Sequence, residues 1–141
     1  MKKTSILKNK TIIIGIGRLG SAIANKCASE GKNLIVIDNH KEAFDRLDEN
    51  FSGYTIIGDT TDLTVLESAY IKTAKEVIIT TGDDNVNIYL AYVARKVFDV
   101  PNVYIRLDAP ENEILLKGLG VKGIYPQELS YDKFNLMRGG R

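Results

Sequence analysis

The sequence predicts a doubly wound α/β domain, with a mostly parallel six-stranded sheet and helices on both faces. Short apolar runs alternate with helix-like segments along the whole chain. These runs are apolar at successive positions, which is typical of strands covered on both faces. The first run leads directly into Gly15-Ile16-Gly17-Arg18-Leu19-Gly20. Right-handed crossovers then favour a Rossmann-like sheet, most simply in the order 3-2-1-4-5-6.

Six strands and their intervening helices are expected from local patterns. The strands are the β-branched or apolar runs at 11–14, 33–37, 54–57, 76–81, 102–107 and 123–125. One helix follows the glycine-rich loop, and others are expected at 41–50, 63–69, 84–98, 110–116 and 129–137. Phe44 and Leu47 are expected to face inward from the second of these helices. Pro110 lies near a first helical turn, where its missing N–H costs little.

Length and composition fit one globular domain. The chain has 141 residues, 44% hydrophobic and 26% charged, with a formal net charge of +1. This balance offers no basic surface for nucleic acid. No apolar run approaches the roughly 18–20 residues that span a bilayer, and no signal-like segment follows the basic N-terminus, so a cytoplasmic location is expected. We expect an N-terminal extension at 1–9, the domain at 10–137 and a tail at 138–141.

The single cysteine and the single histidine suggest no chemistry of their own. Cys27 excludes a disulfide framework or a cysteine-based metal site, and it lies at helical spacing from Ile23. It is therefore expected to pack as a small core residue. His40 follows the second strand and is expected in a surface loop.

The glycine-rich loop carries the strongest functional signal. Gly15 is expected to make a tight turn, Gly17 to let backbone approach a phosphate, and Gly20 to let helix and strand pack closely. The helix that follows presents free N–H groups and a positive dipole end to an anion. The alternative is a glycine turn that serves only the fold.

An acidic residue at the end of the second strand strengthens the nucleotide interpretation. Asp38 lies eighteen residues after Gly20, which is about where a ribose hydroxyl pair is bound in such folds. A carboxylate there repels a 2′-phosphate, so NAD or an adenosine nucleotide is favoured over NADP.

Ligands of doubly wound sheets lie outside the carboxyl ends of the strands, near the switch between the first and fourth. Every long predicted strand ends in polar or glycine residues there. Beyond the loop and Asp38, the candidates are Asn39, Gly58, Asp59, Thr60, Thr81, Gly82, Asp83 and Arg106. Arg18 and Arg106 are expected to neutralise phosphates, with solvated surface charges as the alternative. Asp62 is expected to cap a helix, whereas Asp83 and Asp84 fit a cap and a ligand role equally well.

Three motifs together identify a family resemblance. Gly15-Ile16-Gly17-Arg18-Leu19-Gly20, Gly58-Asp59-Thr60-Thr61 and Thr81-Gly82-Asp83-Asp84-x-x-Asn87 resemble the RCK/KTN (TrkA-N) regulatory domain of Trk/Ktr-type potassium uptake systems, over about residues 10–134. The resemblance implies a non-catalytic domain that binds NAD(H) or ATP/ADP at the cytoplasmic face of a membrane-embedded potassium channel or transporter. It also implies homodimers and dimer-built rings.

The resemblance also implies residue roles. Gly15, Gly17, Arg18 and Gly20 would hold phosphates, and Asp38 would hold the ribose. Gly58, Asp59 and Thr60 would lie along the adenine, with Thr81, Gly82 and Arg106 on the phosphate or nicotinamide side.

This sequence departs from the family pattern in two places. Family members often carry a smaller C-terminal lobe, whereas this sequence stops at Arg141, either as part of a longer protein or because the lobe is naturally lacking. ATP-responsive members tend to place an acidic residue directly after the proline that follows the sixth strand, and here Gln127 follows Pro126.

Two other functions remain open from the residues. One is the cofactor half of an NAD-dependent oxidoreductase whose catalytic part lies elsewhere. The other is an assembly module that has lost its ligand. No nucleophile elbow, H-E-x-x-H or Walker lysine occurs, so acyl, peptide and P-loop chemistry have no support.

Apolar faces beyond those needed for the sheet predict self-association. In the 84–98 helix, one stripe is expected against the sheet, comprising Val86, Leu90, Val93 and Val97. A second face is expected to carry Ile88, Tyr89 and Tyr92. Ile114, Leu115, Leu116 and Leu119 are apolar around much of the next segment. Phe134, Leu136 and Met137 are expected to anchor a neighbour or a further lobe, because a surface helix of a monomer normally shows one apolar stripe.

Overall fold

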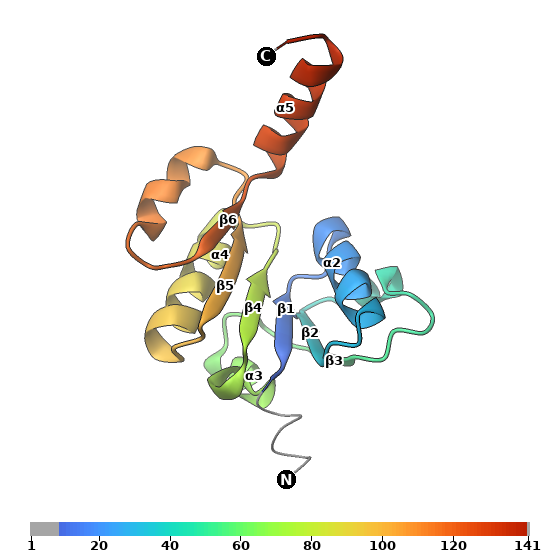
Figure 1. Ribbon diagram of the computed structural model, residues 1–141. Coiled ribbons are helices and arrows are strands. Elements are labelled where there is room, and N and C mark those ends of the chain that lie inside the picture. The colour runs from blue at the N-terminus through green and yellow to red at the C-terminus, as the bar shows by residue number, and fades with distance from the viewer. Residues whose placement is uncertain (1–8, 141) are drawn as a thin grey trace.

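A computed structural model describes residues 9–140 of the chain. Its six strands form one sheet in the order β3-β2-β1-β4-β5-β6 (Figure 1). Every neighbouring pair is parallel. The predicted doubly wound topology is therefore confirmed. The predicted N-terminal extension at 1–9 lies outside the described residues except for its last residue.

The strands match their predicted positions to within about two residues. They are β1 (Thr11–Ile14), β2 (Leu34–Asp38), β3 (Tyr54–Ile57), β4 (Glu76–Ile79), β5 (Asn102–Arg106) and β6 (Lys122–Ile124). Ile14 of β1 is level with Ile37 of β2 and with Ile79 of β4. The three central strands therefore end together, and the loops that follow them meet at one edge of the sheet.

Residues 9–140 contain four α-helices and four 3₁₀- or π-helical segments. The α-helices are α2 (Arg18–Ser29), α3 (Leu63–Ser68), α4 (Asp84–Tyr92) and α5 (Pro126–Met137), of which α5 follows the last strand. The 3₁₀- or π-helical segments are η1 (Lys41–Arg46), η2 (Ile71–Thr73), η3 (Val93–Val97) and η4 (Pro110–Leu116). Among the described residues, no helix is long and apolar enough to cross a membrane.

The hydrophobic core has two parts, one on each face of the sheet. On one face α3, α4 and η4 pack through residues such as Leu66, Leu90 and Leu116. On the other face α2 and η1 pack through residues such as Ala24 and Phe44. Because both faces are covered, the three central strands are buried at every position except the last residue of β2 and the first of β4.

The prediction of a helix at 41–50 is wrong in both its length and its type. Only the 3₁₀ segment η1 forms, and the chain becomes extended at Leu47. The side chain of Asn25 in α2 donates to the Arg46 carbonyl and accepts from the Asp48 N–H, at 3.4 and 3.0 Å. These contacts use backbone groups that a longer helix would bond internally. Phe44 and Leu47 do pack inward, as predicted.

The helix expected at 84–98 changes geometry part-way along. After α4 it continues as the π-helical segment η3, in which the Phe98 N–H donates to the Val93 carbonyl. The wider turn rotates the last residues, so Val97 is 60% exposed rather than packed on the sheet. Ile88 packs against the core instead of sharing the exposed face with Tyr89 and Tyr92.

The last two helical segments also differ from prediction. The segment at 110–116 is 3₁₀-helical, which suits a short connector. The final helix begins at Pro126, three residues before the predicted position 129, because proline is favoured in a first helical turn. Helix α5 projects away from the sheet (Figure 1), and none of its residues is buried.

Candidate functional site

The glycine-rich loop has the geometry that its three glycines predict. Gly15 has a φ of +90°, and a Cβ there would lie 2.6 Å from the Thr81 nitrogen. A Cβ on Gly20 would collide with the Gly15 carbonyl oxygen and lie 2.7 Å from Thr80 Oγ1. A Cβ on Gly17 would meet nothing within 4 Å. Two glycines therefore permit close packing, whereas the third leaves open space at the start of α2.

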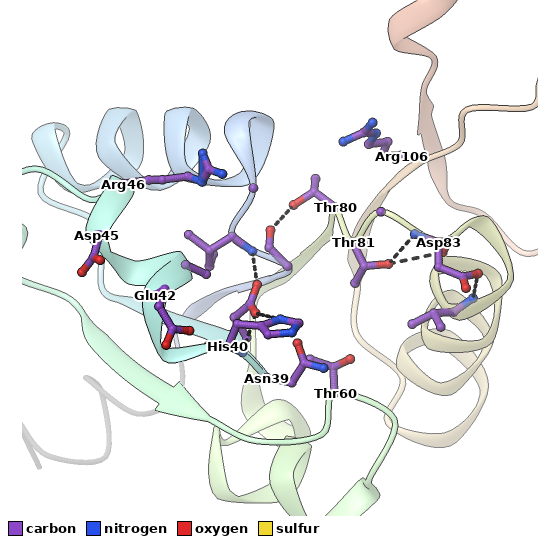
Figure 2. A pocket seen from close by; sticks show the side chains of 17 residues that line it. Asn39, His40, Glu42, Asp45, Arg46, Thr60, Thr80, Thr81, Asp83 and Arg106 are labelled. Carbon is purple, nitrogen blue, oxygen red and sulfur yellow. Dashed lines mark hydrogen bonds and ion pairs between the residues drawn. The ribbon is translucent and has the colours of Figure 1, made fainter.

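That open space belongs to a cleft of about 870 Å³ at the switch point between β1 and β4 (Figure 2). Ten of the predicted site residues line it: Gly15, Ile16, Gly17, Asp38, Asn39, Thr60, Thr81, Gly82, Asp83 and Arg106. The cleft therefore brings together the ends of five strands, as predicted from the topology.

Five predicted site residues do not line this cleft: Arg18, Leu19, Gly20, Gly58 and Asp59. Gly20 packs closely against the Gly15 carbonyl and the Thr80 side chain. The Gly58 N–H donates to the Asp38 carbonyl. The Asp59 carboxylate accepts bonds from the Thr61 hydroxyl and N–H at 2.7 and 2.9 Å, and these lower its pKa. Ligand contacts from these five residues stay predictions.

Asp38 is held firmly at one side of the cleft. Its Oδ2 accepts a hydrogen bond from the Ile16 N–H, and its Oδ1 accepts one from the His40 N–H, each at 2.8 Å. The imidazole Nδ1 of His40 lies 3.5 Å from the same Oδ1. The carboxylate is therefore fixed beside the glycine-rich loop, and each oxygen retains a lone pair for a further donor.

A buried asparagine, which was not assigned a role from the sequence, organises the opposite side. Asn87 is fully buried. Its Oδ1 accepts from the Thr81 N–H and hydroxyl, and its Nδ2 donates to the carbonyls of Thr81 and Arg106 at 3.1 and 2.9 Å. One side chain thus joins the ends of β4 and β5. Its place in the third motif was the available signal.

The three aspartates before helices have separate roles. Asp62 caps α3 by accepting from the Thr64 N–H at 2.9 Å, as predicted. Asp83 caps α4 through the N–H groups of Asn85 and Val86, and it also lines the cleft. Capping and a place at the site are therefore combined in Asp83.

Asp84 anchors the loop after β5. Its carboxylate accepts from the N–H groups of Asp108 and Ala109 at 2.8 and 2.9 Å, and from the Asn112 amide at 3.2 Å. Partial burial opposes ionisation, but these hydrogen bonds and nearby Arg106 outweigh it, so the pKa of Asp84 is lowered. Asp84 acts as a structural anchor instead of a cap.

Further cleft residues were not among the predicted site residues. His40, Glu42, Ala43, Asp45 and Arg46 line the side formed by η1, and Thr80 and Val86 line the β4–α4 side. The η1 residues were missed because candidates were expected only among the residues that directly follow the strands. Thr80 donates from its hydroxyl to the Gly15 carbonyl at 2.7 Å. Within residues 9–140, no group of three or more His, Cys, Asp or Glu side chains could hold a metal ion.

The parallel sheet, the three-glycine loop, the fixed acid after β2 and the cleft at the switch point define a domain of the Rossmann class. Within that class, residues 11–125 match the TrkA-N domain, and the chain belongs to this family. The resemblance predicted from the three motifs is confirmed.

Known proteins similar to this chain include potassium transport proteins. The "Trk system potassium uptake protein TrkA" of Streptomyces coelicolor is 36% identical over 110 residues, which cover 78% of this chain and 49% of that protein. The chain spans about half the length of this curated relative. The crystal structure of the GsuK RCK domain has a TM-score of 0.79 at 25% identity, covering 94% of this chain and 28% of the other.

More distant structures share the fold. A GsuK channel bound to NAD and GsuK bound to ADP each have a TM-score of 0.70 at 19% identity. They cover 83% and 84% of this chain, and 21% and 31% of their own chains.

Proposed function

We propose that this chain is a non-catalytic, cytoplasmic nucleotide-binding domain that regulates a potassium channel or transporter through ligand-dependent changes in subunit arrangement. The observation that carries the proposal is the open cleft between Gly17 and the fixed carboxylate of Asp38. NAD(H) or ADP/ATP is the proposed ligand. Membership of the TrkA-N family and the GsuK structures bound to NAD and to ADP support this choice.

The proposed ligand lies across the switch point. Its phosphates approach Gly17 and the free N–H groups at the start of α2, where no side chain caps the helix. The ribose hydroxyls donate to Asp38. Arg106 lines the same cleft and supplies positive charge on the phosphate side. We propose these contacts because the cleft has an open glycine turn, suited to phosphates, on one side and a carboxylate, suited to ribose hydroxyls, on another.

The position of the single histidine favours binding over hydride transfer. A dehydrogenase needs a general acid or base beside the hydride-accepting carbon. The sole histidine, His40, contacts Asp38 on the proposed ribose side. The proposal therefore treats a bound nicotinamide nucleotide as an effector instead of a reactant.

The first test is calorimetric titration of the whole chain with NAD, NADH, ADP, ATP and NADP. At least one of the first four is expected to bind. NADP is expected to bind at least about tenfold more weakly than NAD, because the Asp38 carboxylate repels its 2′-phosphate. If none of the four binds or raises the melting temperature, the domain is an assembly module and the proposed sensor function fails. Turnover of NADH with a carbonyl substrate would instead favour an oxidoreductase.

Exposed apolar side chains support the proposed homodimer and dimer-built ring. Ile114 and Leu115 of η4 are 73% and 50% exposed, and the hydroxyl of the half-exposed Tyr92 of α4 donates to the Leu115 carbonyl. Helix α5 exposes Leu129, Tyr131, Phe134, Leu136 and Met137, each by more than half. Because α5 projects from the sheet (Figure 1), its apolar side chains lack cover within residues 9–140. A second copy of the chain is the proposed cover.

Sedimentation velocity tests this assembly. The chain is expected to dimerise at micromolar concentration. A variant with Leu136→Glu and Met137→Glu is expected to dimerise at least about tenfold more weakly, since charges replace two apolar side chains that the proposed dimer would bury. Lys75→Glu, the same change of charge at an exposed position before β4 and outside α5, is the control. A wild-type chain that stays monomeric at high micromolar concentration, with and without nucleotide, would contradict the proposed dimer.

A further inference from the structure

We propose that Asp108 competes with the phosphates of a bound nucleotide for Arg106, and so lowers the affinity of the cleft for phosphate-bearing ligands without changing its affinity for uncharged ones. The inference rests on the proposed function. Asp108 was not among the site residues predicted from the sequence. Its side chain lies outside the cleft that Arg106 lines.

The two side chains form a two-point ion pair. Arg106 donates from Nε to Asp108 Oδ1 at 3.0 Å and from Nη2 to Oδ2 at 3.4 Å. The arginine side chain is 27% exposed and the aspartate side chain 50% exposed. Figure 2 shows Arg106 reaching from β5 toward the start of α2, the proposed phosphate end of the cleft.

The pairing limits what Arg106 can offer to a ligand. One edge of the guanidinium, comprising Nε and Nη2, is already used by Asp108. A phosphate must either displace the carboxylate from this edge or bind the remaining donors of a neutralised pair. Both routes weaken binding relative to a free arginine. The loss applies only to a ligand group that bears negative charge.

The loop that carries Asp108 does not depend on this pair. The Asp108 N–H donates to Asp84 Oδ1, and the Ala109 N–H donates to Asp84 Oδ2. The Arg106 carbonyl is held separately by Asn87. Removing the Asp108 carboxylate therefore leaves the backbone anchored on both sides. Asp108→Asn changes the charge beside Arg106 and keeps the shape of the side chain.

The test is calorimetric titration of the whole chain and of the Asp108→Asn variant with ADP and with adenosine. ADP is expected to bind roughly two- to fivefold more tightly to the variant, the range that an exposed ion pair gives. Adenosine is expected to bind both proteins equally, because it has no phosphate. The gain for ADP is expected to shrink as salt concentration rises.

Two further variants isolate the pair. Glu111→Gln removes an equal charge from exposed η4 and is expected to leave ADP affinity unchanged. In an Arg106→Gln background, Asp108→Asn is expected to give no gain. The inference is overturned if Asp108→Asn leaves ADP affinity unchanged, if adenosine gains equally, or if Glu111→Gln gives the same gain. If neither wild type nor variant binds ADP or NAD, the proposed function fails as well, which distinguishes the two failures.

Discussion

Gly20→Ala is expected to lower the free energy of unfolding by about 3 kcal/mol, at the upper end of the usual range for overpacking. The added Cβ would collide with the Gly15 carbonyl oxygen. That obstacle is backbone, so no flexible side chain can move aside. Gly15 has little room to retreat, because the Thr81 backbone lies so near that a Cβ on Gly15 would be 2.6 Å from the Thr81 nitrogen. Urea denaturation followed by circular dichroism measures the loss.

Gly17→Ala is the matched control from the same loop. Gly17 has a φ of −89°, which alanine adopts freely, and a Cβ there would meet nothing within 4 Å. The free energy of unfolding of the Gly17→Ala variant is expected to differ from that of the wild type by about 1 kcal/mol or less. Nucleotide affinity is expected to fall at least about tenfold, since the methyl group takes the space through which a phosphate approaches. Equal stability of the two variants would contradict the packing role of Gly20.

Asp38→Ala is expected to lower the affinity for the nucleotide, whether NAD(H) or ADP/ATP, by about 10- to 100-fold. Hydrogen bonds to a charged group contribute about 1.5–3 kcal/mol, and the variant removes the proposed bonds from the ribose. It also frees the N–H groups of Ile16 and His40 that now hold the loop beside the cleft. Calorimetric titration with the ligand identified from the nucleotide panel measures the effect.

Asp48→Ala controls for the loss of one negative charge. Asp48 is exposed and lies outside the cleft, and its hydrogen bonds come from the backbone: its N–H donates to Asn25 and its carbonyl accepts from the Phe51 N–H. Its replacement is expected to leave nucleotide affinity unchanged. Unchanged affinity in a folded Asp38→Ala variant would mean that the ribose does not bind at Asp38 and that the proposed site is misplaced.

The sheet could be predicted because its signals are local. The apolar run 11–14 has to be covered on both faces wherever it lies, and a loop with three glycines predicts the turn that follows it. The strand order then follows from the right-handed crossover rule without any knowledge of side-chain contacts. The same reasoning placed ten of fifteen candidate residues around one cleft.

The helices were less predictable because their ends depend on distant side chains. Apolar spacing predicted a ten-residue helix from position 41, yet Asn25, twenty-one residues earlier than Arg46, bonds the backbone where η1 ends. The turn at Val93–Val97 is similar, since its π geometry moves Val97 to the surface without altering the apolar pattern of the sequence.

By itself the sequence determined the layered architecture, the glycine-rich turn and the acid at the end of β2, because each depends on residues adjacent in the chain. Only the tertiary structure decided which polar groups are already engaged. Asn87 joins Thr81 to Arg106, and Arg106 is paired with Asp108. The physical reason is that hydrogen bonds are short-ranged and directional, so their partners are selected only once the strand ends lie side by side.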